Sequence, residues 1–284
     1  NAGVAEQNMT AVAAGMALSG RIVFTYSIGN FPVLRCLEQI RNDAAYHDAN
    51  VNVVSIGGGF SYGPLGMSHH ATEDIAIMRA LPQVTTLVPG TREDVAHSVD
   101  HLVATSGVGY LRLDKSAGKE TAEAQSYAPG SWRLMRDGGD VALVATGGVL
   151  ESAQGAAELL QETGISARVV NAVQLAPMSN EIVREVLAGV PLVLTVEEHV
   201  TRGGLGGLVA ESLAGAAGSA VVERCGIDAG FLSAVGSQGY LRTKVGLDAT
   251  SLAYRARRVL DGLPDVGELD LRDSDVTSDQ EAAP

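Results

Sequence analysis

The chain has 284 residues and a formal net charge of −13, and 46% of its residues are hydrophobic while only 4% are aromatic. This length can bury the cores of two domains, whereas the negative charge argues against a nucleic-acid surface, which needs clustered Lys and Arg. Cys36 and Cys225 lack metal-ligand spacing and no apolar run reaches the roughly 20 residues of a membrane span, so we expect a cytoplasmic protein without a zinc site, a disulfide framework or a membrane segment.

The first half of the chain alternates predicted helices and strands. It opens on Gly3–Met9 without a preceding strand, so we expect that residues upstream of Asn1 are missing from the chain. The residue patterns then predict a helix at 8–18, a strand at 21–26, a helix at 31–42, a strand at 51–56, a glycine-rich loop at 57–66, a helix at 71–80, a strand at 85–88, a helix at 92–105 and a strand at 109–113. This alternation indicates a parallel sheet with both faces covered.

A polar segment with Gly118 and Pro129 leads to a second unit of the same kind. Its pattern predicts a strand at 141–145, a helix at 151–163, a strand at 167–171, a helix after Ser179, a strand at 192–196, a glycine-rich turn at 203–207 that opens a helix, and a strand at 220–224. The predicted fold class is therefore α/β, with two domains that are each a mainly parallel sheet covered by helices. We place these domains at 1–118 and 138–261, a linker at 119–137, and an acidic, disordered tail at 262–284.

Glu6 is the first candidate for chemistry, because it lies where a loop enters a helix among small and apolar neighbours. A carboxylate that loses water in such a place keeps its proton more readily, which suits acid–base work near neutral pH. A carboxylate at a helix start is also favoured by the helix dipole, so a purely structural role is an alternative.

Several motifs along the chain resemble the transketolase family, which includes 1-deoxyxylulose-5-phosphate synthases and the β subunits of 2-oxo acid dehydrogenases. The resemblance extends from Asn1 to about Leu260 and rests on Gly3–Met9, Glu38-Gln39-Ile40-Arg41-Asn42, Met67–Asp74, Arg79–Pro82, Tyr110-Leu111-Arg112, Thr195–His199 and Gly203–Gly206, in the family's order. It implies a pyrimidine-binding domain of a thiamine-diphosphate enzyme, followed by the transketolase C-terminal domain.

The resemblance implies roles for individual residues. Glu6 would bond N1′ of the cofactor's aminopyrimidine and favour the imino tautomer, so that the thiazolium C2 becomes a carbon nucleophile. Phe31 would stack on the pyrimidine, with Ile28 and Leu34 beside it, where family members often carry aromatics. Before the resemblance is counted, Phe31 could equally be an ordinary core residue.

The resemblance also implies substrate contacts. His69, and beside it His70, would contact the substrate, where an imidazole can hydrogen-bond a hydroxyl and move protons. Adjacent histidines seldom bind one metal from a rigid element, so no metal site is predicted there. Arg112, at the end of a predicted strand, would bind a sugar phosphate, although such an Arg is also commonly a surface ion pair.

Two departures from the family pattern concern the substrate. Leu65 stands where transketolases carry an acid that reads a donor hydroxyl, and a second family histidine is replaced within Gly57-Gly58-Gly59. These differences put the usual ketose phosphates in doubt while leaving cofactor activation intact.

The family's Gly-Asp-Gly motif, which holds diphosphate and magnesium, does not occur in this chain. The resemblance therefore implies a partner: an N-terminal, diphosphate-binding subunit that holds Mg²⁺ and forms an α2β2 heterotetramer with this chain. In the second domain, Glu197, Glu198 and His199 are expected near the subunit interface.

Three functions remain open at this stage. The first is a transferase that moves a two-carbon ketol unit from a ketose phosphate to an aldehyde. The second is thiamine-dependent acyl transfer from a 2-oxo acid, which Leu65 makes conceivable. The third is a non-catalytic structural or regulatory subunit. A simple dinucleotide-binding protein is disfavoured, because its glycine fingerprint is incomplete.

Overall fold

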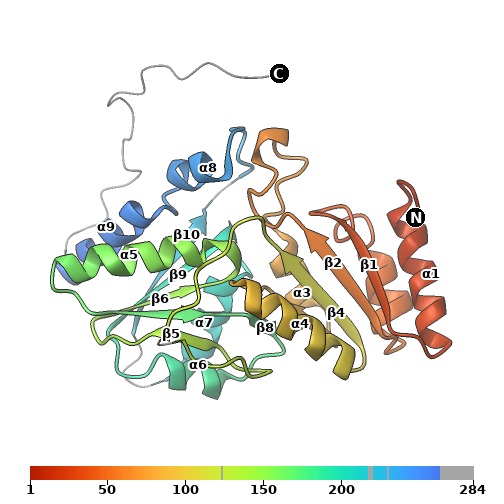
Figure 1. Ribbon diagram of the computed structural model, residues 1–284, viewed down its shortest axis with the longest axis horizontal. Helices are drawn as coiled ribbons and strands as arrows, with labels where there is room; N and C mark the ends of the chain where they lie inside the picture. The colour runs from red at the N-terminus through yellow and green to blue at the C-terminus, as the bar shows by residue number, and fades with distance from the viewer. Residues whose placement is uncertain (123, 217–219, 229, 263–284) are drawn as a thin grey trace.

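A computed structural model describes residues 1–122, 124–216, 220–228 and 230–262. Two five-stranded sheets lie side by side, each between layers of helices (Figure 1). This confirms the predicted fold class. The predicted acidic tail lies outside the described residues, apart from its first position, and the domain boundaries given above stay a prediction. No helix within the described ranges combines the length and apolar character needed to cross a bilayer.

The first sheet has the order β1-β2-β4-β3-β8. Its first four strands are parallel and β8 is antiparallel to β3. The strands are β1 (Val23–Ile28), β2 (Val51–Ile56), β3 (Val84–Leu87), β4 (Val108–Leu113) and β8 (Gln174–Ala176). Because β8 comes from the second half of the chain, the two halves share this sheet.

Helices cover both faces of the first sheet. On one face, apolar residues of α1, η1 and α3 pack against β2, β3 and β4. On the other, Leu102 of α4 packs against Val54, Leu87 and Leu111. The elements are α1 (Glu6–Leu18), α2 (Leu37–Gln39), the π-helix η1 (Ile40–Ala45), the 3₁₀-helix η2 (Gly63–Leu65), α3 (Asp74–Ala80) and α4 (Arg92–Ala104).

The helix predicted at 31–42 is replaced at its start by turns, and regular helix begins only at Leu37. Pro32 lacks the N–H that a continuing helix would use. The Val33 and Leu34 N–H groups both donate to the carbonyl of Asn30, which closes the turn after β1. This turn carries Phe31 and therefore shapes the candidate site.

The second sheet has the order β10-β9-β6-β7-β5, with β5 antiparallel to β7 at its edge. Its strands are β5 (Arg133–Arg136), β6 (Val141–Ala145), β7 (Ala167–Asn171), β9 (Leu192–Val200) and β10 (Val221–Ile227). β5 falls in the segment that the sequence predicts to be a linker. Both sheets are thus parallel except at one edge.

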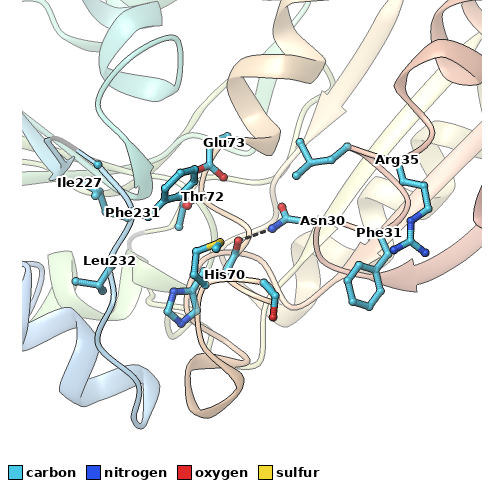
Figure 2. A pocket seen from close by; sticks show the side chains of 13 residues that line it. Asn30, Phe31, Arg35, His70, Thr72, Glu73, Ile227, Phe231 and Leu232 are labelled. Carbon is cyan, nitrogen blue, oxygen red and sulfur yellow. Dashed lines mark hydrogen bonds between the residues drawn. The ribbon is translucent and has the colours of Figure 1, made fainter.

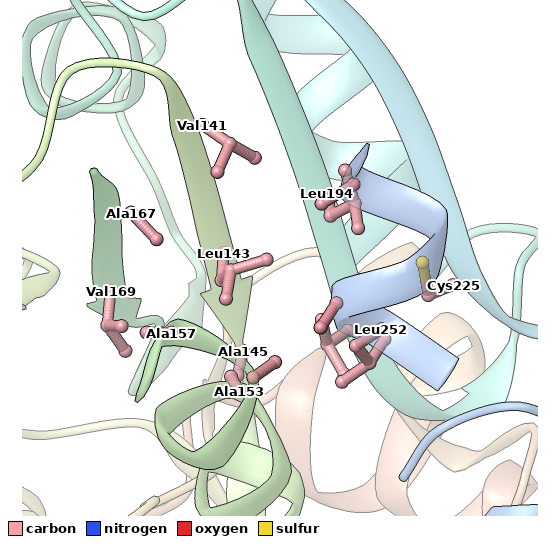
Figure 3. Close-up of a cluster of buried hydrophobic side chains, with 14 of the residues drawn as sticks. Val141, Leu143, Ala145, Ala153, Ala157, Ala167, Val169, Leu194, Cys225 and Leu252 are labelled. Carbon is pink, nitrogen blue, oxygen red and sulfur yellow. The ribbon is translucent and has the colours of Figure 1, made fainter. Parts of the chain in front are cut away.

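The second sheet is also covered on both faces. Figure 3 shows small and branched side chains of β6 packed against α5 and α9, while α6 and α7 pack on the opposite face. The elements are the 3₁₀-helix η3 (Gly147–Val149), α5 (Leu150–Glu162), α6 (Asn180–Val186), α7 (Leu205–Leu213), α8 (Gln238–Lys244) and α9 (Ala249–Leu260).

A buried ion pair joins α4 of the first unit to β5 of the second. Arg133 Nη1 lies 2.5 Å from Asp94 Oδ1, with both side chains almost fully buried. Asn171 Nδ2 donates to the other Asp94 oxygen over 2.7 Å, and Arg133 Nη2 lies 2.9 Å from Glu120 Oε2. Each buried charge therefore has several polar partners, which the loss of water requires.

We expect Arg133→Met to lower the free energy of unfolding by about 3–5 kcal/mol, because it leaves the Asp94 carboxylate buried without its cation. Urea unfolding followed by circular dichroism measures the change. Asp137→Asn is the control, because it removes an ion pair to Arg168 in which the carboxylate is 75% exposed, and its effect should stay within about 0.5 kcal/mol. Equal stability of Arg133→Met and the unmodified chain would contradict the interpretation.

Candidate active site

The Glu6 carboxylate lies at the N-terminal end of α1, facing the end of β1 and the turn that follows it. The side chain is buried, and Arg35 Nη1 donates to Glu6 Oε2 over 2.6 Å. Ser27 Oγ lies 3.5 Å from Oε1. The predicted catalytic acid is thus withdrawn from solvent and has polar partners on both of its oxygens.

The pKa of the Glu6 carboxyl lies below its usual value. A hydrogen bond from its own backbone N–H lowers the pKa most, and Arg35 and Ser27 lower it further, while burial opposes these effects. The expectation that burial would make Glu6 keep its proton is therefore wrong for this chain by itself, because donors at the start of α1 and Arg35 favour the anion.

Phe31 lies in contact with both Arg35 and His69. The Arg35 guanidinium carbon is 5.1 Å from the centre of the Phe31 ring, and the His69 ring meets Phe31 edge-on with centroids 5.3 Å apart. Gly29, two residues before Phe31, has a φ of 41°, a left-handed backbone conformation that favours glycine at the turn. The structure thus brings together residues that the sequence predicts from two separate motifs.

A cavity of about 240 Å³ opens between the two halves of the chain (Figure 2). One wall comes from the turn after β1 and from the histidine loop, and it includes Phe31 and Leu34. The other wall follows β10 and includes Phe231 and Leu232. Ile28, predicted to line the cofactor site with Leu34, does not line this cavity.

The two histidines have different surroundings. His69 is partly exposed, and Ser68 Oγ lies 3.0 Å from its Nδ1. His70 is buried, with its Nε2 3.3 Å from the carbonyl of Gly63, and its own carbonyl accepts a hydrogen bond from Asn30 Nδ2 over 2.5 Å. His70 lines the cavity, whereas His69 lies outside its lining and packs edge-on against Phe31. Substrate contact by either residue stays a prediction.

Arg112 is buried at the end of β4, where it is only 2% exposed. Its Nε donates to Asp74 Oδ2 over 2.8 Å, and its Nη2 donates to the carbonyls of Ala71 and Glu198. A Cβ at Gly58 would overlap the guanidinium. Binding of a sugar phosphate would require Arg112 to leave these partners, so that prediction is not carried into the function proposed below.

Family models match both halves of the chain. Residues 1–120 match the model described as transketolase, pyrimidine binding domain, and residues 130–251 match transketolase, C-terminal domain. The chain belongs to the transketolase family. The resemblance that the sequence motifs indicate is thereby confirmed.

Three similar proteins illustrate the relationship. A subunit of the apulose-4-phosphate transketolase of Actinobacillus succinogenes is 34% identical over 256 residues, which are 89% of this chain and 81% of the relative. A 1-deoxy-D-xylulose-5-phosphate synthase of Heliobacterium modesticaldum is 31% identical over 91% of this chain and 40% of its own length. A solved structure named "Split gene transketolase, inactive beta4 tetramer" has a TM-score of 0.78 and 32% identity, covering 90% of this chain and 81% of that chain.

Glu198 connects the two domains of this transketolase-family chain beside the site. It accepts hydrogen bonds from the backbone N–H of Phe60, over 2.9 Å, and from Gln238 Nε2, and it forms an ion pair with Arg242. Gln238 also donates to Asp114 Oδ1 over 2.9 Å. Burial raises the pKa of Glu198, with Asp114 adding to the effect and Arg242 opposing it. The carboxylate thereby ties the glycine-rich loop, which leads to His69, to α8.

Glu197 and His199 serve as internal supports. Glu197 accepts the N–H groups of Leu205 and Gly206 over 2.7 and 2.8 Å at the start of α7, and His199 Nε2 accepts the N–H of Ala76 over 3.2 Å. Together with Glu198, all three residues are buried within a single chain, and their position near a subunit interface stays a prediction.

Three features of this site were not predicted from the sequence. Arg35 could have been suspected, since it lies four residues after Phe31 in the same motif-bearing segment. The role of Glu198 and the cavity wall at Phe231 depend on contacts between distant parts of the chain, for which no local pattern exists.

Among the described residues, no group of three or more His, Cys, Asp or Glu side chains could hold a metal ion.

We expect Gly59→Ala to lower the free energy of unfolding by about 1–3 kcal/mol, because Gly59 has a φ of 59° and an added Cβ would overlap the Glu198 side chain. Gly139→Ala is the matched control, since a Cβ there meets nothing within 4 Å. Chemical denaturation measures both variants. A Gly59→Ala chain as stable as Gly139→Ala would contradict the role given to this loop.

Proposed function

We propose that this chain is the pyrimidine-binding subunit of a split, thiamine-diphosphate-dependent transketolase. With a partner it transfers a two-carbon ketol unit from a ketose phosphate to an aldehyde. The observation that carries the proposal is the buried Glu6 carboxylate, which is paired with Arg35; Arg35 also lies over the Phe31 ring, and that ring contacts His69. The Actinobacillus succinogenes relative is itself named as one subunit of a transketolase, which supports a division of the enzyme between two chains.

The residues present fit the aminopyrimidine of the cofactor. A carboxylate and an aromatic face are the two groups that such a ring needs, and both Glu6 and Phe31 contact the side chain of Arg35, which is 45% exposed and can move aside. When bound, the cofactor supplies a carbon nucleophile that can accept and release a ketol unit.

Each residue of the site has one task in this proposal. Glu6 holds a proton at N1′ of the aminopyrimidine, and Phe31 orients the ring by stacking, with Ile28 and Leu34 as apolar neighbours. His69 turns its Nε2 to a substrate hydroxyl, while Ser68 lies beside its Nδ1. His70 supports the substrate side of the cavity from within the loop.

The diphosphate and Mg²⁺ need groups that the residues described here do not supply. No Gly-Asp-Gly sequence occurs here, and the described residues contain no cluster that could hold a metal. We therefore assign both to an N-terminal transketolase subunit, in an α2β2 assembly with the cofactor at the junction.

Two features of the chain bear on the donor. Leu65 replaces the family's hydroxyl-reading acid and is 55% exposed, while Phe231 and Leu232 add apolar surface to the cavity. A 2-oxo acid, decarboxylated before transfer, is therefore the second candidate donor.

We expect Glu6→Gln to reduce turnover of the reconstituted pair by at least about 100-fold, because Gln cannot exchange a proton at N1′. Steady-state assays with thiamine diphosphate and magnesium measure this effect, and a thermal melt checks that the fold is kept. Glu162→Gln, at the exposed end of α5, is the control and should leave turnover unchanged. Near-normal activity of Glu6→Gln would contradict the proposal.

We further expect activity only after this chain is mixed with its N-terminal partner. A screen of ketose phosphates with aldehyde acceptors, followed by product analysis, tests both the partner and the donor. Release of carbon dioxide from pyruvate without ketol exchange would favour the second donor. A partner that is equally active alone would overturn the catalytic role of this chain.

A further inference from the structure

Arg35 touches both groups that the aminopyrimidine would need. Its Nη1 lies 2.6 Å from Glu6 Oε2, and its guanidinium lies over the Phe31 ring at 5.1 Å. Figure 2 shows the guanidinium beside that ring, at one side of the cavity. One side chain therefore contacts the carboxylate and the aromatic residue together.

The chemistry of this contact opposes that of the proposed function. A guanidinium stays protonated in proteins and can only donate hydrogen bonds, so its partner carboxylate is favoured as an anion. A carboxyl that holds a proton at a ring nitrogen must instead be able to carry that proton itself. A pyrimidine stacked on Phe31 would also need ring surface over which the guanidinium now lies, so the cation and the aminopyrimidine compete for the same place.

We infer that in the cofactor-free chain Arg35 occupies the place of the aminopyrimidine and must withdraw from Glu6 and Phe31 before the cofactor binds. This inference rests on the proposed function. Arg35 is then a positioning residue, which controls access to Glu6 without reacting itself.

The contact is weak enough to be opened by a ligand. Arg35 is nearly half exposed, and exposed ion pairs stabilise only slightly. Competition by Arg35 should therefore weaken cofactor binding by about two- to fivefold. Among the described residues, Cys36 is a second titratable group whose charge interacts with Glu6, and burial is the main cause of its raised thiol pKa. Arg35 is therefore the side chain to substitute in a test of the cation at Glu6.

The test uses Arg35→Met and Arg35→Gln, which remove the charge with side chains of different shape. Arg21→Met is the control, because Arg21 is exposed just before β1. In the partner-free chain, ¹³C NMR titration follows the Glu6 carboxyl, assigned by its loss in Glu6→Gln. We expect both Arg35 variants to raise the pKa of Glu6 and the control to leave it unchanged.

In the reconstituted pair, calorimetry with magnesium and thiamine diphosphate measures cofactor affinity. We expect both Arg35 variants to bind the cofactor about two- to fivefold more tightly than the unmodified pair. Unchanged or weaker cofactor binding by both variants, or an unchanged Glu6 pKa, would overturn this inference and leave the proposed function standing. Absence of cofactor binding by the unmodified pair would overturn the proposed function instead.

Discussion

The buried carboxylate of Glu198 fixes the geometry on which the candidate site depends. It binds the backbone of the glycine-rich loop on one side and Arg242 and Gln238 on the other, so the first domain's loop is held by the second domain. A buried charge is tolerable only when several partners replace its water, and here those partners come from distant parts of the sequence. The glycine-rich loop that leads to His69 is therefore held by residues of both domains.

The site has two states in this account. In the chain alone, Arg35 keeps Glu6 paired and covers Phe31. In the working enzyme, the same carboxyl must exchange its cation for a ring nitrogen. Until the cofactor binds, the hydrogen bond from Arg35 gives the buried Glu6 carboxylate a polar partner, and the aminopyrimidine then takes the place of Arg35. The proposed division of the cofactor between two subunits fits this arrangement, since the partner would add the groups that hold the diphosphate.

Much of the fold could be predicted from sequence, because continuous apolar runs identify buried parallel strands. The strands at 141–145 and 167–171 have the predicted bounds. The prediction of a helix that begins at Phe31 is wrong, because Pro32 and the carbonyl of Asn30 favour a turn. The joining of β8 to the first sheet and the contacts of Arg35 could not be predicted, since both depend on tertiary packing. Arg112 shows the same limit: its strand-end position was predicted, but its buried partner Asp74 was not.

A structure of the reconstituted pair with thiamine diphosphate and magnesium tests the central claim most directly. The account predicts that the Glu6 carboxyl lies within hydrogen-bonding distance of N1′, that the Phe31 ring stacks on the pyrimidine, and that Arg35 has left both. A cofactor bound elsewhere, or a Glu6 side chain that faces open solvent in the assembly, would contradict it.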